Sequence, residues 1–336
     1  MQVAFFGNGL DYSLFYLKAL MEAKVDIVAV VAPDRDGTPG RRSRRITSQL
    51  RARLPSSVKR SLATNMYDRF LVNLSELAEE AGAVLYTPET VNDPSLVDEL
   101  SLLNPELIVM AGFNEILKSV VLDELSPIIN IHPSLLPHFK GPHPEFWVVR
   151  SGSQESGVTI HLVSHGVDTG PILAQQSFKL EPWLSGGDLH YRSMAVGRRL
   201  LHQLLAGWAG DQTPRWPQDG EGSYYGKVDD SDLVVPFGEP SALVHAHARA
   251  IAPWSPVHLY VERPWWEAGP RMNLTTSASR TRGQDMLRIQ LRFSSMYPGY
   301  TIGTPGTLRR TEDGGLAVAC TDGTVAYAEA RAQSTP

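Results

Sequence analysis

Cysteine is almost absent from this chain, because Cys320 is the single cysteine among 336 residues. One cysteine excludes an internal disulfide framework and is typical of a protein kept in a reducing compartment. No uncharged apolar run reaches membrane-spanning length, and the N-terminal MQVAFFGNGL lacks the basic start and long apolar core of a signal peptide. We therefore expect a cytoplasmic protein with no membrane partner.

A strong charge of either sign is also missing, since the formal net charge is only −5. The chain as a whole is therefore not suited to electrostatic binding of nucleic acid. Hydrophobic residues make up 42% of the sequence, which allows a sizeable core, and the length favours two domains.

Short apolar runs alternate with helical patterns through the first half of the chain. The runs that predict buried strands cover residues 3–6, 27–31, 107–111 and 128–131, and the predicted helices cover residues 11–22, 65–82, 94–103 and 116–125. This alternation predicts an α/β domain with a parallel, Rossmann-like sheet. Strands at 157–164 and 172–178 and a helix at 186–206 complete the domain, which we place at residues 1–208.

The second half of the chain has a different pattern. Residues 209–226 are rich in Gly, Pro and polar side chains, which predicts a linker. A helix at about 239–251 follows, and then turn residues separate the apolar runs HLYVE, LRIQLRF, LAVAC and TVAYAE. These runs predict a small, OB-like β-barrel domain at residues 227–336.

Three polar side chains stand out near the end of the first domain. Asn130 and His132 are two residues apart at the end of an apolar run, so both point to one face of a strand. They also lie at the carboxyl end of that strand, which is where open α/β sheets carry their sites. Asp168 follows a second apolar run, in a loop bounded by glycine. An amide, an imidazole and a carboxylate are the groups that acyl transfer needs, because they stabilise an oxyanion, move a proton and orient the imidazole.

The stretches that carry these residues resemble the folate-dependent formyltransferases. NIHPSLLP is similar to that family's Asn-x-His-x-Ser-Leu-Leu-Pro element, and GVTIHLVSHGVDTG is similar to its Gly-Val-Thr…Asp-Thr-Gly element. LIVMAGFNEIL resembles the strand and loop around the pterin ring of the folate. PQDGEGSYYGKVDDSDL and RAIAPWSPVHLY resemble the linker and barrel of methionyl-tRNA formyltransferase and some amino-sugar formyltransferases.

The resemblance implies 10-formyltetrahydrofolate as the formyl donor, a primary amine as the acceptor, and no metal. Asn130 and His132 would bind the developing oxyanion, and His132 would also act as the acid or base. Asp168 would steer His132 and help accept the proton of the attacking amine. Losing one oxyanion donor in such a site costs roughly 2.7–4 kcal/mol in the barrier.

The resemblance also implies where the folate binds, beside the strand at 107–111. The residues expected to contact it are Met110, Gly112, Phe113, Ile116, Leu117, Val163 and Gly166. Phe113, Ile116 and Leu117 would form a wall for the flat pterin ring, although the same residues also fit the start of an ordinary helix.

The acceptor side departs from the methionyl-tRNA enzymes. HFKGPHPEFW follows SLLP where those enzymes carry an Arg-containing segment and Gly-Ala-Ala-Pro, and GNGLDYS stands where they carry a Gly-Thr-Pro-Glu-Phe-like element. We therefore favour a small-molecule amine, such as an amino sugar, a nucleotide-linked sugar or a biosynthetic amine, over methionyl-tRNA. The residues expected to contact the acceptor are Asn8, Gly9, Ser134, His138, His143, Arg41 and Arg42.

A basic cluster lies between residues 35 and 60, where Asp36 alone opposes a run of arginines and lysines. It is either a solvated loop or a site for an anionic partner such as a phosphate, a nucleotide or the tRNA backbone. The same stretch resembles the basic loop of methionyl-tRNA formyltransferase. From Lys227 onward, however, 11 basic residues balance 11 acidic ones, which adds no net attraction for tRNA.

Other features have less specific interpretations. The four residues His138, His143, His161 and His165 crowd one region, but their spacing fits no closed zinc site. Gly7 and Gly9 suggest a dinucleotide fingerprint whose third glycine is replaced by Tyr12. Trp265 and Trp266 are either barrel core residues or a stacking platform. The rival functions are a formyltetrahydrofolate hydrolase and an inactive folate- or tRNA-binding module.

Overall fold

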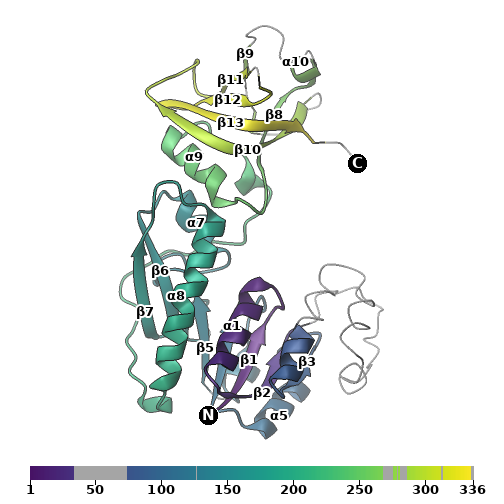
Figure 1. Cartoon of the computed structure of the whole chain (residues 1–336), viewed down its shortest axis with the longest axis vertical. Helices are drawn as coiled ribbons and strands as arrows, with labels where there is room; N and C mark the ends of the chain where they lie inside the picture. The colour runs from purple at the N-terminus through teal and green to yellow at the C-terminus, as the bar shows by residue number, and fades with distance from the viewer. Residues whose placement is uncertain are drawn as a thin grey trace. The chain divides into compact units, whose positions relative to one another are not determined.

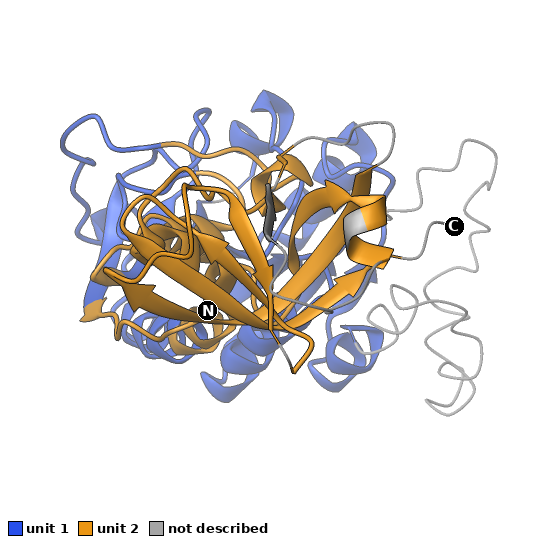
Figure 2. Cartoon of the chain, turned by 90° about the horizontal axis from the view of Figure 1, so that it is seen from above, with its two compact units in different colours: residues 1–140, 157–177, 193–223 blue, residues 141–156, 178–192, 224–336 orange. Residues whose placement is uncertain are grey.

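The computed structural model describes residues 1–33, 74–125, 127–267, 275–277, 279–280, 286–311 and 313–333. The chain divides into two compact units, coloured separately in Figure 2. The first unit comprises Met1–Lys140, Gly157–Ser177 and Ser193–Ser223, and the second comprises Gly141–Ser156, Phe178–Arg192 and Tyr224–Pro336. Within the described ranges, no helix is long and apolar enough to cross a membrane.

A seven-stranded sheet forms the centre of the first unit (Figure 1). Its strands are β1 (Gln2–Gly7), β2 (Asp26–Val31), β3 (Val84–Tyr86), β4 (Leu107–Ala111), β5 (Ile128–His132), β6 (Glu155–Leu162) and β7 (Ile172–Lys179), in the order β3-β2-β1-β4-β5-β6-β7. Strands β1 to β5 run parallel, whereas β6 runs antiparallel to β5. The predicted α/β, Rossmann-like fold class is confirmed.

Helices α1 (Asp11–Glu22), α5 (Pro94–Leu103), α6 (Ser119–Leu122) and α8 (Gly186–Ala206) pack around this sheet. Ala4 and Phe6 of β1 share one apolar cluster with α5 and α6, because alternate residues of a strand point to the same face. Helix α1 packs against β1 and β4, and α8 lies beside α1. The approach of α8 is close, since a Cβ added at Gly197 would lie 2.1 Å from Tyr16 Oη.

The ends of α5 follow from local sequence. The Asp93 carboxylate accepts a hydrogen bond from Ser95 N at 3.0 Å, and Pro94 occupies the first helical turn, where its missing amide hydrogen costs nothing. The helix ends at Asn104, whose φ of 47° is a left-handed conformation that asparagine tolerates.

The predicted helix at 116–125 is wrong in extent, because α6 spans only Ser119–Leu122. Asn92 accepts a hydrogen bond from Lys118 N at 2.7 Å and donates one to Ile116 O at 3.0 Å. The Glu115 carboxylate accepts from Val91 N at 2.9 Å. A helix at 116–125 would pair the Ile116 carbonyl with a backbone amide, but Asn92 occupies that carbonyl instead. The residues before α6 therefore form a loop.

Other predicted elements differ in smaller ways. Of the helix predicted at 65–82, residues 74–80 are helical, and residues 65–73 lie outside the described part of the chain. The strand predicted at 157–164 begins and ends two residues earlier, as β6. Strand β3 and the short helix α7 (Pro144–Arg150) were not predicted.

The second unit carries an antiparallel six-stranded sheet. Its strands are β8 (Val257–Glu262), β9 (Thr275–Ser277), β10 (Met286–Pro298), β11 (Thr307–Arg310), β12 (Leu316–Ala319) and β13 (Gly323–Ala332), in the order β8-β10-β13-β12-β11-β9. Just beyond β9, Ser279 exchanges backbone hydrogen bonds of 2.9 and 3.0 Å with Tyr260 of β8, so the two edges of the sheet are linked. The predicted barrel-like C-terminal sheet is confirmed.

Helix α9 (Ser241–Ala250) of this unit carries a buried histidine, His247, which is 1% exposed. Its Nε2 donates to the Asp232 carbonyl at 2.6 Å, beside the 3₁₀ turn η2 (Ser231–Leu233). Burial lowers the pKa of His247 to about 4, because a ring removed from water resists becoming charged.

Acid should therefore destabilise the second unit through His247. The unfolded chain keeps the ordinary pKa of 6.5, so between about pH 6.5 and 4 the unfolded state binds more protons than the folded state. As the pH decreases through that window, the contribution of His247 to the free energy of unfolding should decrease by up to about 1.4 kcal/mol per pH unit. Above the window, the contribution of this residue should be constant. Urea titrations followed by tryptophan fluorescence measure the slope. His247→Gln should remove this part of the slope, and an unchanged slope would contradict the assignment.

Candidate active site

Four polar side chains meet at the carboxyl end of β5. Asn130 and His132 lie two residues apart on that strand, and His161 of β6 lies directly opposite Asn130 in the antiparallel register. Asp168 comes from the loop between β6 and β7, with a φ of 51° that aspartate tolerates better than most residues. The three side chains predicted to be catalytic are thus brought together, and His161 joins them.

Asp168 lies at the centre of this cluster. Its Oδ1 accepts a hydrogen bond from Asn130 Nδ2 at 3.3 Å and lies 3.5 Å from His161 Nε2, while its Oδ2 lies 3.6 Å from His132 Nδ1. The side chains of His132, His161 and Asp168 are only 5%, 2% and 13% exposed. Electrostatic interactions among these groups are therefore stronger than they would be at an open surface.

The hydrogen bonds of His132 determine which of its nitrogens can exchange a proton. Nε2 lies 2.9 Å from the Phe139 carbonyl oxygen, which can only accept, so Nε2 carries a hydrogen. In the neutral ring, Nδ1 then has the free lone pair, and it faces Asp168. Nδ1 of the neutral ring can therefore accept a proton, with a carboxylate placed to stabilise the imidazolium that would form.

His161 has the opposite arrangement. Its Nδ1 lies 2.8 Å from the Leu162 carbonyl oxygen, so Nδ1 carries the hydrogen. Its Nε2 can then accept from Asn130 Nδ2 at 3.3 Å. Because the Asn130 amide donates to both His161 and Asp168, its nitrogen is turned toward the cluster.

The composition of the sequence did not single out His161 as part of this site. The missing information was the direction of β6, because only the antiparallel register places His161 opposite Asn130. A histidine inside a buried strand was the available signal. The Phe139 carbonyl that bonds His132, and the Ser223 hydroxyl that bonds Phe139 N, gave no signal in the sequence.

Residues predicted to bind the folate lie at the ends of β4 and β6. Met110, Phe113 and Val163 are partly exposed and pack against one apolar cluster, and the Phe113 ring lies 5.6 Å from that of Phe6. Gly112 has a φ of 60°, where a side chain would be strained. Gly166 is exposed in the loop that carries Asp168.

Two predicted members of the pterin wall are placed differently from one another. Ile116 is 69% exposed, whereas Leu117 is 7% exposed and belongs to the core. Leu117 therefore packs in the core beneath the loop and does not present its side chain to a ligand, as the predicted pterin wall would require.

Residues predicted to contact the acceptor are spread over several places. Asn8, 9% exposed, uses its Oδ1 to accept from Leu10 N at 2.9 Å and Ser13 Oγ at 3.1 Å, and Gly9 has a φ of 75°. Ser134 is fully buried and donates to the His138 carbonyl at 2.8 Å, so it braces its own loop.

The remaining predicted acceptor contacts are His138, His143, Arg41 and Arg42. His138 is exposed, and His143 belongs to the second unit, at the start of α7. Arg41 and Arg42 lie outside the described residues.

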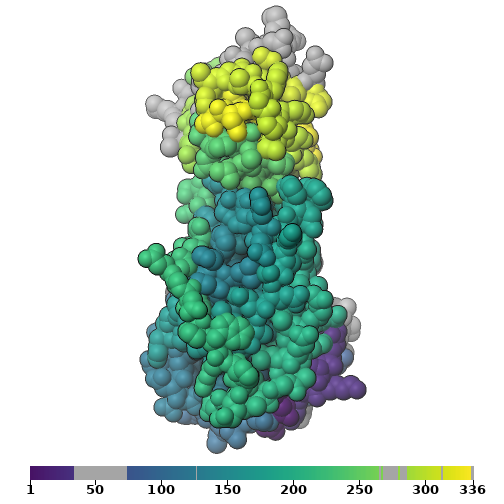
Figure 3. All heavy atoms as spheres, turned by 90° about the vertical axis from the view of Figure 1, so that its left-hand side faces the viewer, coloured from purple at the N-terminus to yellow at the C-terminus, as the bar shows by residue number. Residues whose placement is uncertain are grey.

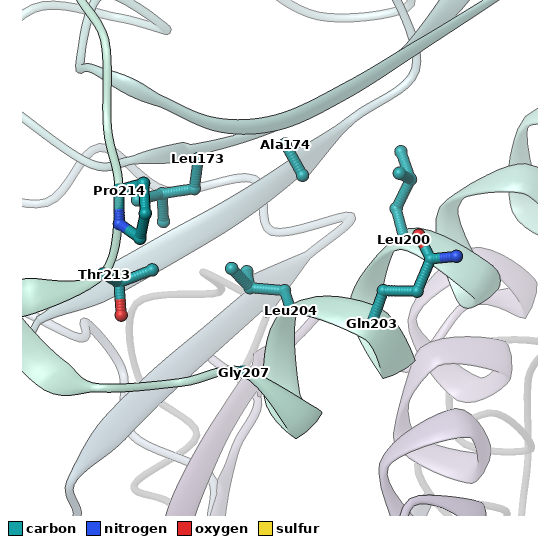
Figure 4. Close-up of a pocket in the computed structure, with 8 residues that line it drawn as sticks. All are labelled: Leu173, Ala174, Leu200, Gln203, Leu204, Gly207, Thr213 and Pro214. Atoms are coloured by element: carbon teal, nitrogen blue, oxygen red, sulfur yellow. The ribbon is translucent and has the colours of Figure 1, made fainter.

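A separate pocket of about 250 Å³ lies between β7 and the end of α8 (Figure 4). Figure 4 shows its lining residues, Leu173, Ala174, Leu200, Gln203, Leu204, Gly207, Thr213 and Pro214. The strand, the helix and the segment after it also form much of the face seen in Figure 3. None of the predicted site residues lines this pocket. Among the described residues, no group of three or more His, Cys, Asp or Glu side chains is arranged to hold a metal ion.

Comparison with known proteins identifies the family. The family described as Formyl transferase matches residues 1–205. A methionyl-tRNA formyltransferase from Chloroflexus aurantiacus is 32% identical over 312 residues, which cover 91% of this chain and 86% of that protein. The chain belongs to the formyl transferase family. The predicted family is confirmed.

Solved structures show that this formyl transferase shares its fold over nearly its whole length. An N-formyltransferase from Helicobacter canadensis, in complex with folinic acid and dTDP-3-aminofucose, has a TM-score of 0.62 at 16% identity and covers 98% of this chain and 99% of its own. WlaRD, a sugar 3N-formyl transferase, has a TM-score of 0.61 at 15% identity and covers 100% and 99%.

The site geometry predicts opposite tautomers for its two histidines. His132 should carry its hydrogen on Nε2 and His161 on Nδ1, because those atoms face carbonyl oxygens at 2.9 and 2.8 Å. Long-range ¹H–¹⁵N correlation spectra at neutral pH distinguish the two forms, with single histidine substitutions to assign the signals. If both rings show the same tautomer, the hydrogen bonding described here is incorrect.

Proposed function

We propose that this enzyme transfers a formyl group from 10-formyltetrahydrofolate to a primary amine of a small-molecule acceptor, with an amino sugar or nucleotide-linked amino sugar as the favoured class. One observation carries the proposal. The Asn130 amide and the His132 ring lie 3.3 and 3.6 Å from the Asp168 carboxylate, at the end of the sheet where α/β enzymes bind substrates.

His132 and Asp168 would handle the proton of the attacking amine. His132 Nδ1 has the lone pair in the neutral ring, and after protonation it would lie 3.6 Å from Asp168 Oδ2. The carboxylate would stabilise that charge, because the two groups are close together and largely removed from water. The same protonated nitrogen would then be a donor for the oxyanion, and its proton would pass to the folate nitrogen as the bond from that nitrogen to the formyl carbon breaks.

Asn130 would be the second oxyanion donor. Its amide hydrogens are directed to Asp168 and His161 over 3.3 Å in each case, which is long for a hydrogen bond. The hydrogen that faces His161 could turn to the oxyanion, which would replace a long bond to a neutral nitrogen by a stronger, charge-assisted bond. His161 would keep the amide in the orientation that makes this exchange possible.

The folate would supply the formyl group, and the chain offers a fitting surface for its ring. Met110, Phe113 and Val163 present partly exposed apolar surface, with Gly112 directly before Phe113 and the exposed Ile116 three residues after it. Folinic acid in the Helicobacter canadensis enzyme supports a folate donor. The proposed roles need no metal ion.

Two observations bear on the acceptor. The dTDP-3-aminofucose in the Helicobacter canadensis enzyme, which covers 98% of this chain, and the altered segments HFKGPHPEFW and GNGLDYS support an amino-sugar nucleotide. The 32% identity to a methionyl-tRNA formyltransferase favours methionyl-tRNA as the second candidate. Arg41 and Arg42 would contact the phosphates of either acceptor.

An acceptor panel separates these possibilities. We expect tetrahydrofolate to form, and the acceptor to gain one formyl group by mass spectrometry, when the protein is mixed with 10-formyltetrahydrofolate and a dTDP-amino sugar. Turnover confined to methionyl-tRNA would favour the second candidate. Tetrahydrofolate release without any acceptor would indicate a hydrolase, and no turnover in any mixture would indicate a binding module.

Asp168→Asn tests the proton-handling role, because the change keeps the shape of the side chain and removes its charge. The kcat should fall by about 10²-fold or more, as for other general acid–base groups, while folate affinity stays nearly constant. Asp123→Asn, at a carboxylate that is 59% exposed, is the matched control and should retain normal activity. Near-normal turnover by Asp168→Asn would refute the role given to Asp168.

A further inference from the structure

The segment 218–223 follows α8 and lies in the stretch predicted from composition to be a linker. In the structure it makes specific contacts with two loops, one that carries Asp168 and one whose Phe139 carbonyl bonds His132. One contact is made by Gln218 and the other by Ser223, and both lie in the first unit together with the cluster. We refer to residues 218–223 as the brace segment.

Gln218 holds the loop of Asp168. Its Nε2 donates to the Asp168 carbonyl at 2.8 Å and to the Gly170 carbonyl at 2.9 Å. Asp168 has a left-handed φ of 51°, which a non-glycine residue keeps only when its surroundings favour it. The two bonds from Gln218 therefore hold the backbone from the carbonyl of Asp168 to the carbonyl of Gly170.

Ser223 holds the loop whose carbonyl binds His132. Its Oγ accepts from Phe139 N at 2.8 Å, its carbonyl accepts from Lys140 N at 2.8 Å, and its own N donates to the Pro137 carbonyl at 3.1 Å. Phe139 has a φ of 57°, an outlier for a bulky residue. Its carbonyl accepts from His132 Nε2 at 2.9 Å, so the orientation of Phe139 determines which nitrogen of His132 carries the hydrogen.

The approach of the brace segment to this loop depends on a glycine. A Cβ added at Gly222 would lie 2.1 Å from the Pro137 carbonyl oxygen, and Gly222 has a φ of 66°. Both facts exclude other residues without a shift of the backbone. The two segments are therefore packed too closely for the contact to be a loose surface encounter.

We propose that Gln218 and Ser223 are positioning residues of the formyl-transfer reaction, which together hold Asp168 and His132 in their reactive geometry. The proposal rests on the catalytic roles proposed above. Ser223 acts through Phe139 by fixing the hydrogen on His132 Nε2 and leaving Nδ1 as the base. Gln218 acts through the backbone by keeping the Asp168 carboxylate beside that nitrogen.

The test compares Gln218→Ala and Ser223→Ala with two control variants. Gln203→Ala removes an exposed glutamine of α8, and Ser231→Ala removes a hydroxyl of the turn η2 that donates to Asp229 nearby in sequence. Each brace variant should lower kcat by about 10-fold through misplacement of a catalytic group, with KM for both substrates changed less than about twofold. Both controls should match the wild type, and Ser223→Thr, which keeps the hydroxyl, should restore kcat.

A second measurement does not depend on activity. In ¹H–¹⁵N spectra, Ser223→Ala should shift the population of His132 away from the Nε2–H form and leave His161 unchanged, since His161 bonds to Leu162 instead. Ser223→Thr should recover the wild-type spectrum. A loss of general stability alone would affect neither ring in the folded protein.

Wild-type kcat and an unchanged His132 tautomer in Ser223→Ala would overturn the proposal, and so would equal losses in the brace and control variants. If the wild type transfers no formyl group to any acceptor, the proposed function fails. The His132 spectra would still decide whether the brace segment orients that ring.

Discussion

The site depends on one partly shielded carboxylate. Asp168 gathers the Asn130 amide and two histidine rings within 3.3 to 3.6 Å, and each of these groups is oriented by a second contact. His132 is fixed by the Phe139 carbonyl and His161 by the Leu162 carbonyl. Because both carbonyls can only accept, the two rings are set in opposite tautomers, and each neutral ring turns its unprotonated nitrogen toward the carboxylate.

The sheet explains how residues distant in sequence reach this point. Parallel strands β4 and β5 end at the same edge, and β6 returns antiparallel beside β5, which brings His161 across from Asn130. The loop after β6 then turns Asp168 back toward β5. Gly170 permits that turn, since a Cβ there would lie 1.8 Å from the Leu162 carbonyl oxygen.

The sequence was sufficient to predict what depends on local pattern. Apolar runs located β1, β2, β4 and β5, and the i, i+2 spacing of Asn130 and His132 placed them on one face. It was insufficient where a contact between distant segments decides the outcome. Asn92 and Glu115 hold a loop where the start of a helix was predicted, the direction of β6 brought in His161, and a segment predicted as a linker contacts the loops that contain Phe139 and Asp168. Composition cannot show that the Gln218 and Ser223 side chains reach carbonyl and amide groups that lie 48 to 84 residues away in the chain.

The most direct test of this account is a crystal structure of the protein with folinic acid and an amine acceptor. We expect the acceptor nitrogen and N10 of the folate, the nitrogen that carries the formyl group in the donor, to lie on opposite sides of a space for one formyl group, and that space to face Asn130 Nδ2 and His132 Nδ1. Binding of the folate ring elsewhere, for example in the pocket between β7 and α8, or a space that faces His132 Nε2 instead, would contradict it.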